Sequence, residues 1–246
     1  MKSARVTVFL VAAAFAAGTI AHADDAKPQR HLVFTFGVTI ATTSTEHTSG
    51  IDGNGGASGS VDSHGSVSDT GTIIADVLSV QPDTGLVVRI SENGRGDRNS
   101  APTMCVTYAT GVVLCDMTAG GPNEEEMSLL RVLGKDFVNP VVLDAKNHWR
   151  TSAQINGGTE TNDYRLDGKQ GDLTSISFDR VLDISGVNGF NAATQGHIMY
   201  NEKTNVPVNM TEDTITRKSR GAGSYDTIDQ KMTFTLSSDS LAQTTH

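Results

Sequence analysis

Residues 31–40 read HLVFTFGVTI, a stretch in which large apolar residues alternate with mostly smaller or polar ones. The large apolar positions are Leu32, Phe34, Phe36, Val38 and Ile40. A period of two predicts a β-strand, because successive side chains of a strand point to opposite faces of its sheet. We therefore expect a strand with one apolar face that packs on a core.

The same alternation recurs along most of the chain, and turn residues separate the runs. The later runs fall at 74–80, 86–90, 104–114, 149–166, 176–184, 198–210 and 232–236. Runs joined by short turns indicate antiparallel hairpins. We predict an all-β, predominantly antiparallel fold, built as a strongly curved sheet or an open or partly closed β-barrel, with one amphipathic helix packed on it.

That helix is expected at residues 123–135. Asn123 is a suitable N-cap, and the following glutamates, 124–126, place negative charge at the positive end of the helix dipole. An apolar stripe follows at Leu129, Leu130, Leu133 and Phe137. Three adjacent glutamates also fit a metal or acid–base site, but the helix dipole accounts for them more simply.

The two cysteines, Cys105 and Cys115, flank a predicted hairpin whose loop is residues 109–111. This loop places Tyr108 opposite Val112, Val106 opposite Leu114 and Cys105 opposite Cys115. Opposed residues lie about 4.5 Å apart at Cα where they are not hydrogen-bonded, within the range of a disulfide. We predict a structural disulfide that stabilises the fold by about 2.5–3 kcal/mol.

The hairpin also has a predicted orientation. Its more apolar face carries Met104, Val106, Tyr108, Val112 and Leu114. Because these side chains are the natural candidates for burial, the disulfide is expected on the opposite, more polar face.

Residues 1–23 have the features of a cleaved secretory signal peptide. Lys2 and Arg5 precede an apolar run at 6–20, and Ala21-His22-Ala23 fits the cleavage rule. We expect an exported protein, periplasmic or extracellular, that is soluble and has no lipid anchor, because no cysteine lies near the cleavage point. The rest is expected as a single exported β-rich domain, 24–240, with a polar tail at 241–246.

Residues 49–71 differ from the rest in being rich in glycine and serine. Burial of so little apolar area only weakly offsets the entropy that is lost when the backbone becomes ordered. We expect a flexible loop here, or at best a thin edge hairpin.

The chain is acidic. Removal of residues 1–23 takes away two of its 19 Lys and Arg residues and none of its 28 Asp and Glu, which changes the net charge from −9 to −11. Nucleic acids and anionic membranes favour basic surfaces, so neither is an expected partner. No transmembrane segment is expected in the mature chain.

Motifs of catalysis are missing from the sequence. It contains no Gly-x-Ser-x-Gly elbow, no phosphate loop and no histidines at zinc-ligand spacing. Carboxylates such as Glu160 and Asp163 fall in polar, turn-rich stretches and are expected to be solvated. We therefore predict no catalytic residue, no metal site and no cofactor.

Arg180 is an exception to the pattern, because it falls in the inward row of an apolar strand. Such a charge either has a partner or lines a cavity, unless the assumed register of the strand is wrong. These explanations stay open at this point. The candidate cavity-lining residues are Phe34, Phe36, Leu133, Phe178, Arg180 and Phe234.

A curved sheet with a helix on it can enclose an apolar cavity. The leading hypothesis is therefore a non-enzymatic periplasmic or secreted binding or carrier protein for an apolar or amphipathic, lipid-like ligand. One alternative is a structural or assembly factor of the cell envelope that acts through contacts with an envelope protein. The other is a hydrolase with scattered carboxylates, which requires a polar cleft holding two carboxyl groups of shifted pKa.

Overall fold

A computed structural model provides the structure of the chain. It describes residues 27–48, 59–81, 85–94, 100–108, 112–118, 120–133, 147–155, 158–184, 190–221 and 223–241. The expected signal peptide, the hairpin loop at 109–111 and most of the polar tail lie outside the described residues.

The described residues form one antiparallel sheet of eleven strands and one helix. The elements are β1 (Arg30–Thr48), β2 (Gly59–Gln81), β3 (Gly85–Asn93), β4 (Thr103–Thr107), β5 (Val113–Cys115), α1 (Glu124–Leu130), β6 (His148–Ile155), β7 (Gly158–Gln170), β8 (Leu173–Ile184), β9 (Phe190–Asn201), β10 (Val206–Gly221) and β11 (Ser224–Asp239). The sheet is curved and not closed, so the predicted fold class is confirmed.

The strand order is β5-β4-β3-β2-β1-β11-β10-β9-β8-β7-β6. Within each half of this order, every strand pairs with its neighbour in the sequence. The two halves are joined where β1 pairs with β11, from Leu32 opposite Asp239 to Thr45 opposite Tyr225. The first and last strands thus lie at the centre of the sheet.

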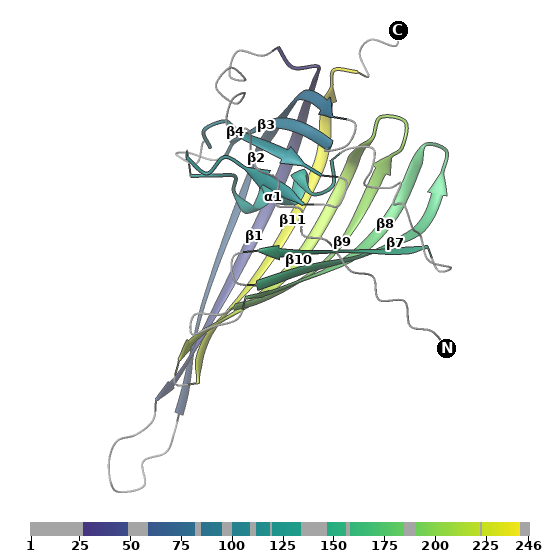
Figure 1. The fold of residues 1–246 in the computed structure, drawn as a ribbon. Helices are drawn as coiled ribbons and strands as arrows, with labels where there is room; N and C mark the ends of the chain where they lie inside the picture. Colours follow the sequence, from purple (N-terminus) through teal and green to yellow (C-terminus); the bar gives the residue numbers. More distant parts are fainter. Residues whose placement is uncertain are drawn as a thin grey trace, which may run out of the picture.

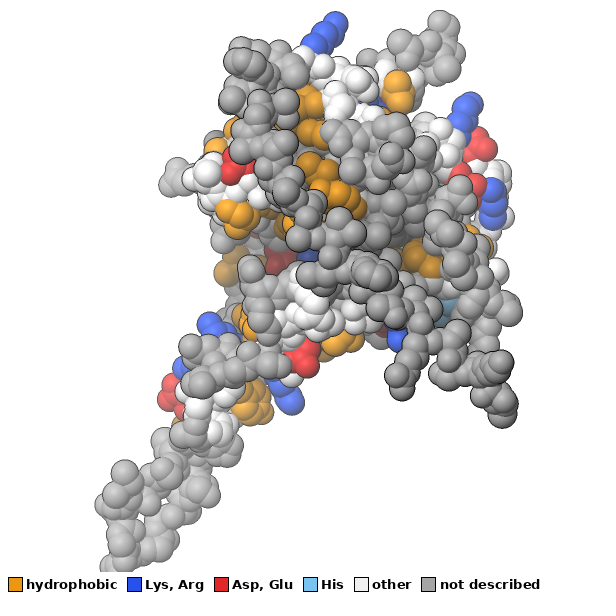
Figure 2. All heavy atoms as spheres, in the orientation of Figure 1, with side chains coloured by type: hydrophobic (Ala, Val, Ile, Leu, Met, Phe, Trp, Pro, Cys, Tyr) orange, Lys and Arg blue, Asp and Glu red, His pale blue; other side chains and the backbone are white. Residues whose placement is uncertain are grey.

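The sheet has the outline of a trough that narrows at one end (Figure 1). The C-terminal ends of β1 and β10 and the N-terminal ends of β2 and β11 converge into a projecting arm. At the other end the strands spread apart. There β3 and β4 fold over the sheet, and α1 lies inside the curve beside them. Basic and acidic side chains gather with hydrophobic ones at the base of the arm (Figure 2).

The predicted alternation of β1 is confirmed. Leu32, Phe34 and Phe36 are buried on the concave face of the sheet, and Thr35 and Thr39 are exposed on the convex face. Across the centre of the sheet, Phe36 lies opposite Phe234 of β11. The core is therefore a layer between the concave face and α1, as burial of one strand face requires.

The cysteine hairpin has the predicted register but not the predicted orientation. Cys105 lies opposite Cys115, and their sulfurs are bonded. However, Cys105 is buried in the core while Leu114 is 43% exposed, so the disulfide faces inward. The reason is the pairing of β4 with β3, which places Cys105 beside the buried Val88. The neighbouring strand decides which face of the hairpin is buried.

Helix α1 begins as predicted but is shorter than the expected 123–135. Asn123 is its N-cap: Asn123 Oδ1 accepts from the Glu126 amide at 2.8 Å, and Glu126 Oε2 accepts from the Asn123 amide at 2.9 Å. The helix ends at Leu130, because the amides of Val132 and Leu133 bond three residues back, in the tighter 3₁₀ pattern. In the part of the chain described, no helix is long and apolar enough to cross a membrane.

For the second part of the segment 49–71 the flexible loop is wrong, and the structure shows the alternative expectation, an edge hairpin. Residues 59–71 form the first half of β2, and they pair with β1 without interruption from Gly59 opposite Thr48 to Gly71 opposite Phe36. Backbone hydrogen bonds to β1 order this stretch although its side chains contribute little apolar area. Residues 49–58 lie outside the described part.

Candidate functional site

The concave face of the sheet is divided into two halves with different surroundings. In the half near the open end, α1 covers the strands, and its Leu129 and Leu130 are fully buried. In the half that leads to the arm, the same rows of side chains become accessible. Ile40 is half-buried, and Val67 is 66% exposed.

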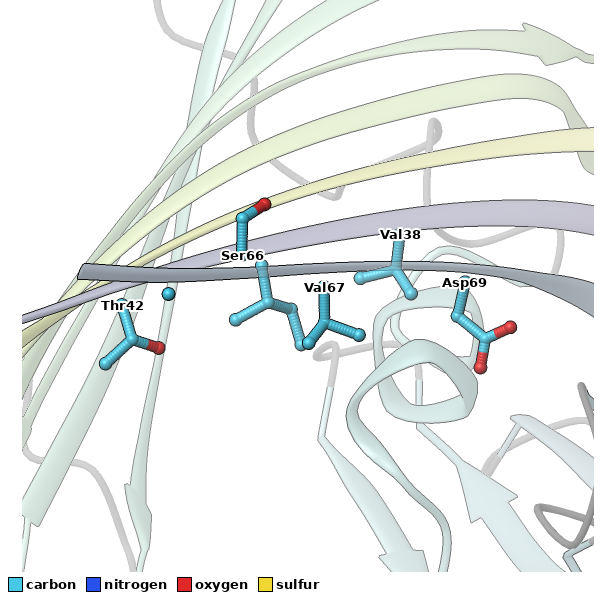
Figure 3. Close-up of a pocket in the computed structure, with 7 residues that line it drawn as sticks. Val38, Thr42, Ser66, Val67 and Asp69 are labelled. Carbon is cyan, nitrogen blue, oxygen red and sulfur yellow. The ribbon is translucent and has the colours of Figure 1, made fainter.

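A groove of about 350 Å³ marks the start of this accessible half. Its lining residues come from β1 and β2 and are Val38, Ile40, Thr42, Gly65, Ser66, Val67 and Asp69. Pairing places Val38 opposite Asp69 and Ile40 opposite Val67. Figure 3 shows Val38, Val67 and Asp69 on the same side of the two strands, whereas Ser66 points to the other side. We call this the β1–β2 groove.

Side chains of the same character continue from the groove across the sheet. The strand pairing places Thr42 in one row with residues of β11, β10, β9 and β8, all of them partly buried: Ile228, Thr216, Ala192 and Leu182. The concave surface beyond α1 therefore presents methyl-bearing side chains over most of its width.

A second cavity, of about 260 Å³, lies at the open end of the trough. Its lining residues are Gln29, Arg30, Leu32, Val77, Val80, Leu86, Leu133, Asn205, Val206 and Leu241. Arg30 is held there by Asp239, with Nε donating to Oδ1 at 2.9 Å, and this ion pair helps to hold the pKa of Asp239 below its usual value despite burial.

Arg180 is buried, and the structure answers the question that the sequence left open. Its Nη2 donates to Glu212 Oε1 at 3.2 Å, and its Nε donates to Asn162 Oδ1 at 2.9 Å. The guanidinium also lies over the ring of Phe178, 5.3 Å from its centroid. The assumed inward register was right, and Arg180 is there because it has a partner.

A second ion pair extends this network to α1. Glu160 Oε2 accepts from Arg131 Nη2 at 3.0 Å, and Glu160 Oε1 accepts from Asn162 at 3.1 Å. Glu212 Oε2 accepts from Ser128 Oγ at 2.7 Å. The expectation that Glu160 is solvated was wrong, because its strand turns that side chain toward the helix.

Three aromatic rings adjoin the network. Trp149 stacks on Tyr164 at 5.1 Å between ring centroids, and Tyr164 lies 5.8 Å from Phe178. Burial raises the pKa of the Tyr164 hydroxyl to about 12. The ring of Phe178 occupies the space over Gly196, where a Cβ would meet the ring at 2.3 Å. The only tryptophan of the chain therefore lies close to the buried charges.

Acidic side chains gather near the start of α1. Burial raises the pKa of Glu92, the charges of Glu125, Glu126 and Asp69 act in the same direction, and a hydrogen bond from Asn123 opposes them. Glu126 accepts from Ser100 Oγ at 2.8 Å as well as from the N-cap. Within the described ranges, no group of His, Cys, Asp or Glu is arranged to hold a metal ion.

The six predicted cavity-lining residues are all buried: Phe34, Phe36, Leu133, Phe178, Arg180 and Phe234. Leu133 lines the cavity at the open end, and Arg180 lies against Phe178 in the ion-pair network. The β1–β2 groove begins at the next inward positions of β1, Val38 and Ile40. That the six line a ligand cavity stays a prediction.

The residues predicted from the sequence do not include Arg131, Glu212 and Asn162. A signal was available for Glu212, because it stands between Met210 and Thr214 in the inward row of β10, as Arg180 does in β8. Two opposite charges at inward positions of apolar strands are candidates for pairing with each other.

No family model matches the chain, and no curated protein matches it. A solved structure described as "Lipid-protein interactions in lipovitellin" is similar in fold, with a TM-score of 0.49 and 8% sequence identity. The match covers 87% of this chain and 26% of that one, so this chain spans about a quarter of the lipovitellin structure.

Proposed function

We propose that this protein is a non-enzymatic binding or carrier protein that holds an apolar or amphipathic small molecule along the accessible half of the concave face. The observation that carries the proposal is the exposure of an apolar row there, with Val67 66% exposed at the β1–β2 groove. Apolar side chains on a concave surface are typical of a site that a ligand covers.

The dimensions of the surface suit a chain-like ligand. The inward row that contains Gly65 and Thr42, whose members are exposed or partly buried, reaches Leu182 of β8 across β11, β10 and β9. Neighbouring strands lie about 4.8 Å apart, so this row measures about 24 Å from β2 to β8. A single acyl chain laid across the strands fits within that length.

The buried carboxylates support a role in structure over one in catalysis. Glu160 and Glu212 each accept from an arginine and from one further side chain. A hydrolase needs one carboxyl group kept protonated as an acid and another kept free as a base or nucleophile. All four oxygens of Glu160 and Glu212 accept a hydrogen bond from the protein, so neither carboxylate presents an oxygen without such a bond to a substrate.

A protein-binding role is the second candidate, and one observation favours it. β3 pairs with β2 only from Thr72 onward, so among the described residues the outer edge of β2 at 59–71 has no neighbouring strand. An open edge can accept an extended segment of a partner. On this alternative, cross-linking in the host would attach proteins to this edge, and the purified protein would carry no extractable ligand.

The experiment that tests the carrier proposal has two parts. Native mass spectrometry of the protein purified from its own host should show a bound mass that extracts into organic solvent. Titration of the delipidated protein with 1-dodecanol should then show binding, and Val67→Asn should weaken it about tenfold, the loss of about 1.5 kcal/mol for one valine contact.

Val181→Asn is the matched control. Val181 is 51% exposed on the convex face, against 66% for Val67, so the same substitution there removes a well-exposed valine outside the groove. Its affinity for 1-dodecanol should equal that of the unmodified protein. A clean unliganded mass without dodecanol binding, or equal losses in both variants, would contradict the proposal.

A further inference from the structure

The ion-pair network on the concave face lacks one acceptor. All four oxygens of Glu160 and Glu212 accept a hydrogen bond, from Arg131, Asn162, Arg180 and Ser128. Arg131 Nη1, however, is buried and has no hydrogen-bond partner among the residues that the structure describes. A buried guanidinium nitrogen without an acceptor is costly, because it has lost its hydrogen bonds to water.

Arg131 stands at the margin of the network. Its side chain is 14% exposed, whereas those of Arg180 and Glu212 are 5% and 0% exposed. Nη2 donates to Glu160 Oε2 at 3.0 Å, so Nη1 is the guanidinium nitrogen left to donate to a further acceptor. Arginine carries five N–H donors and always a positive charge, which suits it to bind a carboxylate or phosphate oxygen.

The charges around Arg131 come from three elements. Glu124 on α1, Glu160 on β7 and Glu212 on β10 favour its charged form, whereas burial and the neighbouring charge of Arg180 lower its pKa. Glu160 and Glu212 have no oxygen without a hydrogen bond. An additional anionic oxygen would neutralise the repulsion between the two guanidinium groups.

We propose that the ligand of the concave face is a single-chain amphiphile with an anionic head group, whose oxygen accepts from Arg131 Nη1 while its chain lies across the strands toward the β1–β2 groove. This inference rests on the proposed carrier function and specifies its ligand. The direction follows from charge, because Asp69 at the groove and Glu92 beside α1 disfavour an anion at that end.

The test compares ligands that share one twelve-carbon chain: dodecanoate, dodecyl phosphate, uncharged 1-dodecanol and cationic dodecyltrimethylammonium. Binding is measured by calorimetry below the micelle concentration, with Trp149 fluorescence as a second readout. We expect dodecanoate or dodecyl phosphate to bind at least about tenfold more tightly than 1-dodecanol, as a charge-assisted hydrogen bond implies. The stronger of the two identifies the head group.

Variants locate the effect. Arg131→Gln should reduce the preference for the anion over 1-dodecanol to about one. Arg150→Gln is the control, because Arg150 is 67% exposed and pairs with Asp163 on the other face of the sheet. If Arg131→Gln does not fold, Arg131→Lys keeps the charge. The preference for the anion over 1-dodecanol in the unmodified protein and in Arg131→Lys then decides whether an anionic head group is bound.

The outcomes separate the two proposals. Binding of 1-dodecanol with no preference for the anion, a preference for the cation, or a preference that survives Arg131→Gln would overturn the head-group assignment and leave the carrier function standing. Equal affinity for acetate or inorganic phosphate would show that a free anion is bound without the chain. If none of the twelve-carbon compounds binds, the carrier function itself fails.

Discussion

The strands β1 and β2 lie in two environments along their length. Near the open end, Leu32, Phe34 and Phe36 are covered by α1 and by neighbouring strands, and the strands are paired on both sides. Toward the arm, Ile40 and Val67 lose that cover, and β2 has no neighbour on its outer edge in the described part. The large apolar inward side chains of β1 end at Ile40, and the next inward positions are Thr42, Ser44 and Glu46, so the accessible half is less apolar than the core.

The difference shows that the burial of apolar side chains such as Ile40 and Val67 depends on what faces the sheet as well as on the strand sequence. One helix of seven residues and the folded-over strands β3 and β4 supply the cover. The uncovered half therefore has apolar side chains that contribute little to stability, which is the condition for a surface used in binding. Substitutions in the two halves should differ accordingly.

The largest difference is expected for ion pairs. Glu212→Gln in the covered half leaves Arg180 buried without its charged partner, and we expect the free energy of unfolding to fall by about 3 kcal/mol. Asp226→Asn toward the arm breaks the ion pair of Asp226 with Arg220, whose side chains are 22% and 37% exposed, respectively. This variant should lower the free energy of unfolding by less than about 1 kcal/mol. Urea denaturation of both variants measures this. Similar losses would show that the two halves are equally buried.

Two glycines test the packing of the same halves. In Gly196→Ala the new Cβ would meet the Phe178 ring at 2.3 Å and the Thr211 carbonyl oxygen at 2.7 Å, so we expect a loss of about 1–3 kcal/mol. In Gly65→Ala nothing lies within 4 Å, and the smaller entropy of the unfolded chain should stabilise the protein by about 0.5 kcal/mol. Thermal unfolding of the two variants should shift in opposite directions. A loss of stability in Gly65→Ala would mean that the β1–β2 groove is closed in solution.

Much of the fold was predictable from local patterns. The alternation in residues 31–40 predicted a strand and its inward face, and the loop length between Cys105 and Cys115 predicted their pairing. Asn123 predicted the start of α1 through its side chain. Each of these features depends on residues a few positions apart, where one sequence contains all the information.

The errors arose where distant segments decide the structure. Cys105 faces the core because β3 places it beside Val88, although its own hairpin has a more apolar opposite face. Residues 59–71 are ordered by pairing with β1, which their glycine content does not indicate. The partner of Arg180 lies 32 residues away, two strands across the sheet, and no short-range pattern connects them.

The smallest expected effect concerns pH and the acidic side chains beside α1. Because burial raises the pKa of Glu92 above 4.5, the folded state binds this proton more tightly than the unfolded state does. Its contribution to stability therefore grows as the pH falls through the raised pKa toward 4.5. Asp239 should behave in the opposite way, since its pKa is lowered and its contribution is lost as the pH falls below 3.8.

Glu92→Gln isolates this contribution, because glutamine can still accept from Asn123 while the repulsion from Glu125, Glu126 and Asp69 is removed. At neutral pH the variant should be slightly more stable than the unmodified protein, and the difference should shrink as the pH approaches 4.5. Urea denaturation of both proteins between pH 4.5 and 7.5 measures it. A difference that stays constant with pH would show that Glu92 is solvated and that α1 covers less of the sheet at its first turn than at Leu129 and Leu130.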